Sequence, residues 1–200
     1  STFGNQFKIT TWGESHGKAV GVVIDGCPAG LPLTESDIQY YLNLRKPGQS
    51  RYTTPRKEDD AVEIMSGTFE GKTTGSPIFL IVFNKNARSS DYSDIARYYR
   101  PGHADYTFDA KYGFRDYRGG GRSSARETIG RVAAGAVAMK LLAECGIEIC
   151  AYSKAIGPVS IDPAKFNAEE IFNNPVYMPD ADAASEAEAF IAEQMKKQDS

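Results

Sequence analysis

A long run of small and apolar residues between Ser124 and Cys145 constrains the fold more than any other feature of the sequence. Five of the seven residues in 130–136 are alanine or glycine, and the run is long enough for a helix rather than a strand. Ser124 followed three residues later by Glu127 predicts a capping box at its start, and Gly146 predicts its end. Because small side chains let another backbone approach closely, we expect a central, packed helix.

The loop that leads into this helix is rich in glycine and cations. Residues 119–128 read GGGRSSARET, and the longer stretch 100–131 carries seven Lys and Arg against four Asp and Glu. A helix N-terminus disfavours cations unless an anion neutralises them, and glycines let backbone N–H groups approach a phosphate. The pattern predicts an anion site that includes Arg122, Ser123 and Ser124. The alternative is a solvated loop whose arginines pair with the aspartates of the same stretch, Asp105, Asp109 and Asp116.

The chain as a whole is not cationic, so such a site would be local. Its 200 residues carry a net charge of −3, which argues against nucleic acid as the main partner. Its three cysteines show no CxxC spacing, which favours a reducing compartment and argues against a metal site. Neither a membrane span nor a targeting signal is apparent. We therefore expect one globular domain over 1–200, cytoplasmic and without membrane contact.

The remaining pattern mixes strands and helices. Residues 7–12 and 19–25 predict a hairpin, and the continuous apolar run at 76–84 predicts a strand buried on both faces. Thr34 with Asp37 predicts a helix N-terminus. The other predicted elements are a helix that continues to about 44, a strand at 61–67, a short helix at 104–112, a strand at 146–157 and an acidic helix at 180–198.

Two short motifs resemble known signatures without fitting them. GESHG at 13–17 matches the nucleophile-elbow pattern, with Ser15 as nucleophile and His103 as base, but only twelve residues precede it, too few for the strands and oxyanion loop of an α/β-hydrolase. SGTFEGKTTG at 66–75 resembles a P-loop, but three residues separate the first glycine from Gly-Lys where the motif needs four. A tight hairpin turn explains the second stretch better.

Histidines and a second arginine cluster are further candidates for the site. His16 lies in a turn between Gly13 and Gly17, and His103 follows Arg-Pro-Gly close to the arginine-rich loop. A histidine beside an anion is held protonated and can donate a proton, although either one alone could be structural. Arg45 and Arg51 belong to a polar loop that is either a solvated charge cluster or part of the same anion site.

Several blocks together resemble one family. They occur in the order and spacing of the chorismate synthases, and the resemblance covers essentially the whole chain. The blocks are GESHG at 13–17, RKPGQSRYTTPRKE at 45–58, RPGHADYT at 100–107, KYGFRDYRGGGRSSARET at 111–128 and RVAAGAVA at 131–138.

The resemblance implies an activity and its ligands. The family converts 5-enolpyruvylshikimate 3-phosphate to chorismate by a 1,4-anti elimination of phosphate and a proton, a step of the shikimate pathway of aromatic amino-acid biosynthesis. It requires reduced FMN without net redox change, and bifunctional members use NADPH to reduce the flavin. Such a lyase must hold two carboxylates, a phosphate and an anionic flavin, which explains a cluster of arginines.

The resemblance also implies a role for each candidate residue. His16 would protonate the departing phosphate, and His103 would stabilise or protonate the reduced flavin. Arg122, Ser123 and Ser124 would contact FMN.

The resemblance assigns three further arginines to the substrate or to NADPH. Arg126 would contact it directly, while Arg45 and Arg51 match positions assigned to substrate or to NADPH. Lys46 departs from the pattern, since many relatives carry arginine there, and lysine lacks a bidentate fork.

The fold implied is α+β, a βαβ sandwich of antiparallel sheets packed around central helices, assembled as a homotetramer. Members of the family are longer than this chain, so residues 1–200 are expected to form the N-terminal portion, with the C-terminal part absent. The alternative from a different functional class is a non-catalytic fragment that binds an anion or a nucleotide.

Overall fold

The computed structural model describes residues 1–46, 59–85, 94–117 and 120–198. These residues divide into two compact units, Ser1–Ile147 and Glu148–Ser200. Each unit is described by itself below. The assignment of the whole chain to one domain stays a prediction.

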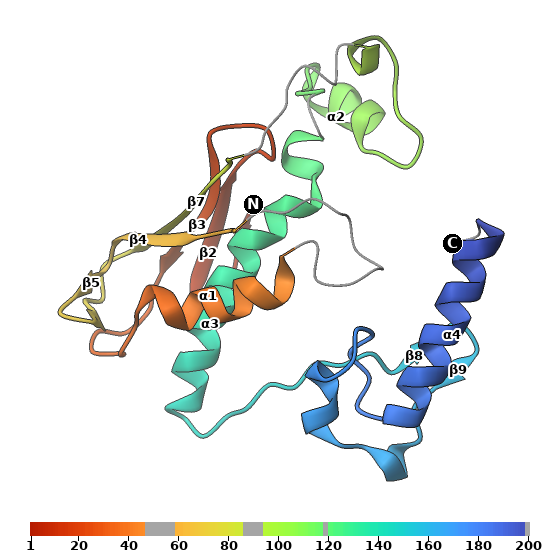
Figure 1. The fold of residues 1–200 in the computed structure, drawn as a ribbon. Coiled ribbons are helices and arrows are strands. Elements are labelled where there is room, and N and C mark those ends of the chain that lie inside the picture. Colours follow the sequence, from red (N-terminus) through yellow and green to blue (C-terminus); the bar gives the residue numbers. More distant parts are fainter. Residues whose placement is uncertain (47–58, 86–93, 118–119, 199–200) are drawn as a thin grey trace. The chain divides into compact units, whose positions relative to one another are not determined.

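A five-stranded antiparallel sheet forms the framework of the first unit (Figure 1). The expected hairpin is confirmed, because β2 pairs with β3 along its whole length. Strand β7 then pairs with β3, with Val22 opposite Leu80. In sheet order the strands are β1 (Thr2–Phe3), β2 (Lys8–Gly13), β3 (Ala19–Asp25), β7 (Ile78–Phe83) and β4 (Val62–Ser66).

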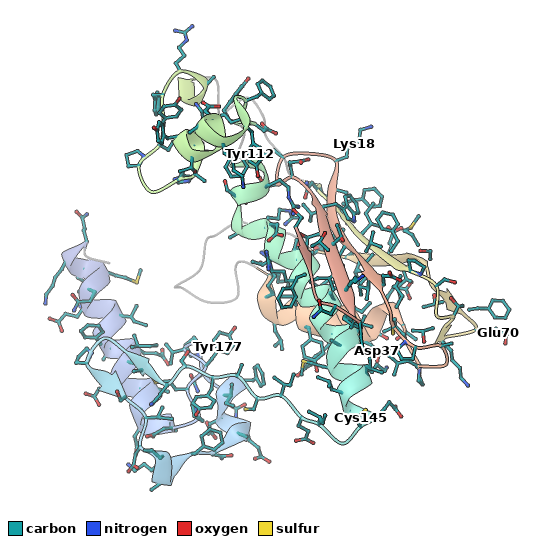
Figure 2. All side chains as sticks on the ribbon, turned by 180° about the vertical axis from the view of Figure 1, so that it is seen from behind. Lys18, Asp37, Glu70, Tyr112, Cys145 and Tyr177 are labelled. Carbon is teal, nitrogen blue, oxygen red and sulfur yellow. The ribbon has the colours of Figure 1, made fainter. Side chains whose placement is uncertain are left out.

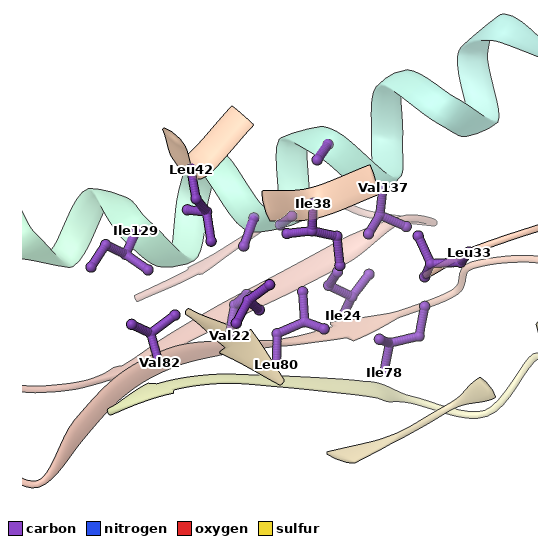
Figure 3. Close-up of a cluster of buried hydrophobic side chains, with 14 of the residues drawn as sticks. Val22, Ile24, Leu33, Ile38, Leu42, Ile78, Leu80, Val82, Ile129 and Val137 are labelled. Atoms are coloured by element: carbon purple, nitrogen blue, oxygen red, sulfur yellow. The ribbon is translucent and has the colours of Figure 1, made fainter. Parts of the chain in front are cut away.

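Two helices cover one face of this sheet, α1 (Glu35–Arg45) and α3 (Thr128–Ala143) (Figure 1). The side chains between them and the sheet form the core (Figure 3). A Cβ atom at Gly130 would lie 2.7 Å from the carbonyl oxygen of Gly21 in β3, so α3 requires glycine here. The prediction of a central, closely packed helix is confirmed.

The apolar run at 76–84 is a strand, but the prediction that both its faces are buried is wrong. Ile78, Leu80 and Val82 are buried against the helices, whereas Phe83 is 46% exposed and the alternate side chains are only half buried. Among the described residues, helices α1 and α3 pack on one face only, which is the physical reason. Alternate side chains of a strand point to opposite faces, so only half the run reaches the core.

The start of α3 differs from the expected capping box. Ser124 does cap a turn, since its Oγ accepts a hydrogen bond from the backbone N–H of Arg126 at 3.3 Å. That turn is a 3₁₀ turn, η4 (Ala125–Glu127), and α3 begins only at Thr128. The Glu127 carboxylate accepts a hydrogen bond from Thr11 in β2 instead of capping the helix backbone. A long-range partner has replaced the local one.

The other helix signals agree better with the structure. The capping box of Thr34 and Asp37 is present at the start of α1. Helix α3 ends at Ala143, two residues earlier than predicted, and Gly146 adopts a φ of +68°. The N–H groups of Gly146 and Ile147 donate to the carbonyls of Ala143 and Leu142, which is a Schellman termination.

The hairpin β5 (Thr68–Phe69) and β6 (Lys72–Thr73) confirms the turn expected at 66–75. Glu70 and Gly71 both adopt positive φ angles, +49° and +75°. Two such residues in sequence make a tight two-residue hairpin turn. This part of the sequence is a turn and not a phosphate loop.

A smaller segment lies between β7 and α3. It contains η2 (Asp94–Arg97) and the expected short helix α2 (Asp105–Tyr112), which ends at Gly113 with a φ of +71°. Together with the sheet and helices described above, it confirms the predicted α+β class, with an antiparallel sheet and packed helices.

The second unit contains little sheet. Its elements are β8 (Ala155–Ile156), β9 (Val159–Ser160), η5 (Pro163–Lys165), η6 (Ala168–Phe172) and α4 (Ala181–Lys197). The strand predicted at 146–157 is therefore wrong except at its last residues, while the acidic helix is confirmed and is capped by the Asp180 carboxylate. None of the helices in the described ranges is long and apolar enough to cross a membrane.

Candidate functional site

The turn at 14–18 joins β2 to β3 at one end of the sheet. Lys18 of this turn and Glu70 of the β5–β6 hairpin lie at opposite ends of the sheet (Figure 2). Because the strands are antiparallel, β7 ends and β4 begins at the end marked by Lys18. Loops that are far apart in the sequence meet there.

A buried carboxylate joins two arginines at this end. Asp60 Oδ2 lies 2.9 Å from Arg45 Nη1, and Asp60 Oδ1 lies 2.9 Å from Arg126 Nη1. The side chain of Asp60 is 0% exposed, that of Arg126 6% and that of Arg45 19%. Arg45 is the last residue of α1, and Arg126 lies in the loop before α3. Two of the three arginines predicted to face the substrate, Arg45 and Arg126, are therefore brought together.

Asn84, directly after β7, links Arg126 to the GESHG turn. Arg126 Nε donates to Asn84 Oδ1 at 2.6 Å. Asn84 Nδ2 in turn donates to the carbonyl oxygens of Glu14 and Gly17, at 3.0 and 2.9 Å. One amide side chain thus fixes the turn that carries His16 against the arginine pair.

Within the turn, Ser15 is buried and its Oγ lies 3.1 Å from Nδ1 of His16. The Ser15 N–H donates to the carbonyl of Gly121 at 3.4 Å. The GESHG turn and the glycine-rich loop therefore lie side by side. The hydroxyl of Ser15 packs inside the turn rather than at its surface, which disfavours the nucleophile-elbow interpretation.

Arg122 turns its guanidinium toward β2. Nη1 donates to the carbonyl of Gly13 at 2.8 Å, and Nη2 donates to Thr11 Oγ1 at 2.7 Å and to Glu127 Oε1 at 3.2 Å. Burial raises the pKa of Glu127, but hydrogen bonds from Thr11 and Arg131 and the charges of Arg131 and Arg122 leave it below its ordinary value. Arg122 therefore anchors the loop to the sheet. Its predicted contact with FMN stays a prediction.

Of the two serines in this loop, Ser123 is exposed and donates to the carbonyl of Gly120 at 2.6 Å, and Ser124 caps η4. Gly120 and Gly121 adopt φ angles of +83° and +51°, a region that favours glycine. The third predicted substrate arginine, Arg51, lies outside the described residues.

His103 lies on a separate turn that an aspartate holds in place. Asp105 accepts hydrogen bonds from the backbone N–H of Arg100 at 3.0 Å and from its Nε and Nη2, each at 2.9 Å. Arg115 Nη1 lies 3.1 Å from the same carboxylate. His103 is exposed, and its Nδ1 lies 3.2 Å from the carbonyl of Pro101. For Arg100 and Arg115 the pairing with nearby aspartates is therefore confirmed.

We expect this aspartate to make stability depend on pH. The hydrogen bonds from Arg100 hold the pKa of Asp105 far below its ordinary value, although burial opposes them. Because the folded-state pKa is lowered, the stabilisation is complete above the unfolded-state pKa of about 4 and is lost as the pH falls below it. Asp105→Asn should therefore lower the free energy of unfolding at pH 7 by more than at pH 3.

Urea unfolding of the complete protein at both pH values checks this expectation. Asp59→Asn is the control, since the Asp59 side chain is 79% exposed. An equal loss for Asp105→Asn at pH 7 and pH 3 would show that the charge of Asp105 does not contribute.

Comparison with known proteins agrees with the motifs at this end of the sheet. A family model for chorismate synthase matches residues 7–200. The chain belongs to the chorismate synthase family. A chorismate synthase of Agathobacter rectalis is 66% identical over 196 residues, 98% of this chain and 53% of the relative. One of Lachnospira eligens is 68% identical over 200 residues, 100% of this chain and 55% of the relative.

A solved crystal structure of a chorismate synthase has the same fold. It matches with a TM-score of 0.75 at 33% identity, over 97% of this chain and 55% of that one. The chain therefore spans about half the length of the chorismate synthases it matches.

Two residues of this end of the molecule, Asp60 and Asn84, were not singled out from the sequence, whereas Asp105 was named there as a possible partner of the arginines. Asp60 is the last of three consecutive acidic residues, 58–60, that follow a cationic stretch of the sequence, and Asn84 directly follows the apolar strand. A polar residue at the end of a buried strand is a signal that could have identified Asn84. The role of Asp60 depends on two arginines far away in the sequence, and only the folded chain reveals it.

Proposed function

We propose that the complete protein is a chorismate synthase that converts 5-enolpyruvylshikimate 3-phosphate to chorismate and inorganic phosphate. In this 1,4-anti elimination the C–O bond to phosphate breaks, the phosphate leaves with the electron pair, and a proton leaves the ring. The observation that supports the proposal most is the convergence of Arg45, Arg126 and the His16 turn at one end of the sheet.

The charge of the substrate explains why arginines would gather there. Two carboxylates and a phosphate need cationic partners, and each charge-assisted hydrogen bond contributes about 1.5–3 kcal/mol. Arginine suits this task better than lysine, because its planar fork binds phosphate and carboxylate oxygens in pairs. In this proposal Arg45, Arg51 and Arg126 bind the substrate, and Arg45 and Arg51 contact NADPH if the protein reduces its own flavin.

The loop at 120–127 fits a flavin phosphate. Its two positive-φ glycines leave the backbone unobstructed, Ser123 offers an exposed hydroxyl, and the N-terminus of the 16-residue helix α3 carries partial positive charge. Arg122, Ser123 and Ser124 would hold the cofactor in this region. Reduced FMN, when bound, supplies the electron-rich partner that promotes C–O cleavage.

The two histidines would carry out separate proton tasks. His16 would donate a proton to the departing phosphate, and His103 would stabilise the reduced flavin or supply a proton to it. Support comes from their positions, because His16 lies on the turn that Asn84 joins to Arg126, and His103 lies on the exposed turn before α2.

A turnover assay tests the proposal. The complete protein, given 5-enolpyruvylshikimate 3-phosphate and reduced FMN, should release chorismate and phosphate in equal amounts. Flavin or phosphate binding without any turnover would instead support a non-catalytic anion- or nucleotide-binding protein.

We also propose a cytoplasmic homotetramer without membrane or nucleic-acid partners, on the basis of the family to which the chain belongs. Analytical ultracentrifugation of the complete protein at several concentrations would measure the assembly. A single monomeric species at all concentrations would contradict it.

Arg122→Ala should weaken the binding of FMN by about tenfold or more, the size expected for loss of one charge-assisted contact. Equilibrium titration of the complete protein with FMN measures the effect. The matched control is Arg131→Ala, because Arg131 also pairs with Glu127 but is more exposed, at 58% against 23% for Arg122. Equal FMN affinity in the two variants would show that Arg122 does not contribute to FMN binding.

A further inference from the structure

Asp60 occupies an unusual position between the two arginines of the candidate substrate site. Each of its oxygens accepts from a different guanidinium, Oδ2 from Arg45 and Oδ1 from Arg126, both at 2.9 Å. Its side chain is 0% exposed. The carboxylate is therefore too deeply buried to meet a ligand directly, whereas Arg45 remains partly exposed.

The backbone around Asp60 is held as firmly as its side chain. Its φ angle of +46° lies in the left-handed region, which a short polar residue such as aspartate tolerates better than most. Gln39 of α1 donates to the carbonyl of Asp60 at 3.3 Å and accepts from the N–H of Val62 at 3.0 Å. Gln39 and Arg45 belong to the same helix, so the carboxylate has a fixed position relative to the start of the Arg45 side chain.

The charge of Asp60 reduces the electrostatic repulsion between Arg45 and Arg126. Two guanidinium groups repel each other, and the repulsion is strongest where water is excluded. A single carboxylate between them offsets that repulsion and leaves one net positive charge. It also sets the spacing of the two groups, since each is hydrogen-bonded to a different oxygen of one rigid plane.

We propose that Asp60 is a positioning residue that holds Arg45 and Arg126 as a spaced pair, so that together they bind the phosphorylated, dianionic end of the substrate. The proposal rests on the proposed function. Asp60 acts through the arginines and touches neither substrate nor cofactor. Its removal should therefore weaken substrate binding more than it slows the chemical step.

Asp60→Asn in the complete protein tests this, because asparagine keeps the shape and removes the charge. KM for 5-enolpyruvylshikimate 3-phosphate should rise by about tenfold or more, the loss expected when a charged hydrogen bond is disturbed, while kcat changes much less. The matched control is Asp59→Asn, since the neighbouring carboxylate is exposed and pairs only with the exposed Lys85 among the described residues. Its KM should stay within about twofold of the unsubstituted protein.

A double-variant cycle separates positioning from simple stabilisation. With Arg45→Met already in place, adding Asp60→Asn should raise KM by a smaller factor than it does alone, because the two residues act through one contact. A purely structural role would lower the urea midpoint and the active fraction and leave KM unchanged. That result would overturn the proposal.

Gln39→Ala provides a second variant should Asp60→Asn fail to fold. It loosens the backbone at 60–62 without removing a charge, and KM should rise in the same direction by a smaller factor. Unchanged KM in every variant that folds would overturn the proposal.

Binding of inorganic phosphate, measured by calorimetry, shows whether the positioning role of Asp60 or the proposed reaction is wrong. If the unsubstituted protein binds phosphate but forms no chorismate, and Asp60→Asn loses the binding, then the pair is a positioned anion clamp and the assigned reaction is wrong. If chorismate forms normally and Asp60→Asn binds substrate and phosphate as well as the control, then the reaction stands and the positioning role is wrong.

Discussion

His16→Ala is expected to lower kcat of the complete protein by about 10²–10⁴-fold, the usual contribution of a general acid. The reason is that unprotonated phosphate is a poorer leaving group than protonated phosphate. His16 is available for this task because Ser15 and Asn84 fix its turn beside Arg126. Substrate affinity should change little, since the arginines proposed to bind the phosphate remain.

His103→Ala is expected to lower kcat by a similar factor through a different step. Its turn is held by Asp105 rather than by the arginine pair, and its side chain is exposed. Loss of this imidazole from the proposed flavin site should change the absorbance and the ionisation of bound reduced FMN. The flavin spectrum of His16→Ala should stay close to that of the unsubstituted protein.

Single-turnover stopped-flow absorbance with phosphate detection separates the two histidines. The control is Ser36→Ala, which alters an exposed residue at the opposite end of α1 from Arg45. The division of tasks is wrong if both histidine variants perturb the flavin equally, or if neither slows turnover by about tenfold.

Elements that depend on neighbouring residues were predicted well from the sequence. The hairpin of β2 and β3 follows from two β-prone runs around a short turn, and the start of α1 follows from a capping box whose partners, Thr34 and Asp37, lie three residues apart. Gly146 ends α3 for a similarly local reason, its positive φ angle. These signals are contained within a few residues, so a single sequence carries them.

Features that depend on distant residues were predicted poorly. Glu127 was expected to cap the helix backbone, but it binds Thr11, 116 residues away. The run GIEICAYSKAIG has the composition of a strand, yet within it only Ala155 and Ile156 form a strand, which pairs with Val159 and Ser160 after a turn at Gly157. A β-prone segment becomes a strand only where a partner is available, and the sequence does not name the partner.

In the candidate site, too, local motifs were predicted from the sequence and long-range contacts were not. The motifs identified His16, Arg45 and Arg126 as separate candidates, and folding brings the segments that carry them to one end of the sheet. The residues that connect them, Asp60 and Asn84, have no motif of their own. Connecting residues are recognised by what they join, which requires the folded chain.

Arg126→Met is expected to have the largest effect on stability. It removes one partner of a carboxylate that is 0% exposed and also leaves Asn84 Oδ1 without the donor it has at 2.6 Å. Breaking a buried ion pair typically costs 3–5 kcal/mol, and we expect about 3 kcal/mol here because Arg45 still neutralises Asp60. Arg126→Lys should recover only part of the loss, since one ammonium group cannot reproduce the separate bonds that Nε and Nη1 make.

The exposed pair of Lys85 and Asp59 supplies the matched control for this experiment. Its atoms lie 3.3 Å apart, and the two side chains are 62% and 79% exposed. Water already screens such charges, so Lys85→Met should change the free energy of unfolding by no more than about 1 kcal/mol. Urea unfolding of both variants of the complete protein, with equal m-values to confirm the same transition, measures the difference. If Arg126→Met costs no more than Lys85→Met, the buried pair of Arg126 and Asp60 contributes no more to folding than an exposed ion pair, and its value would lie in the proposed substrate site rather than in the fold.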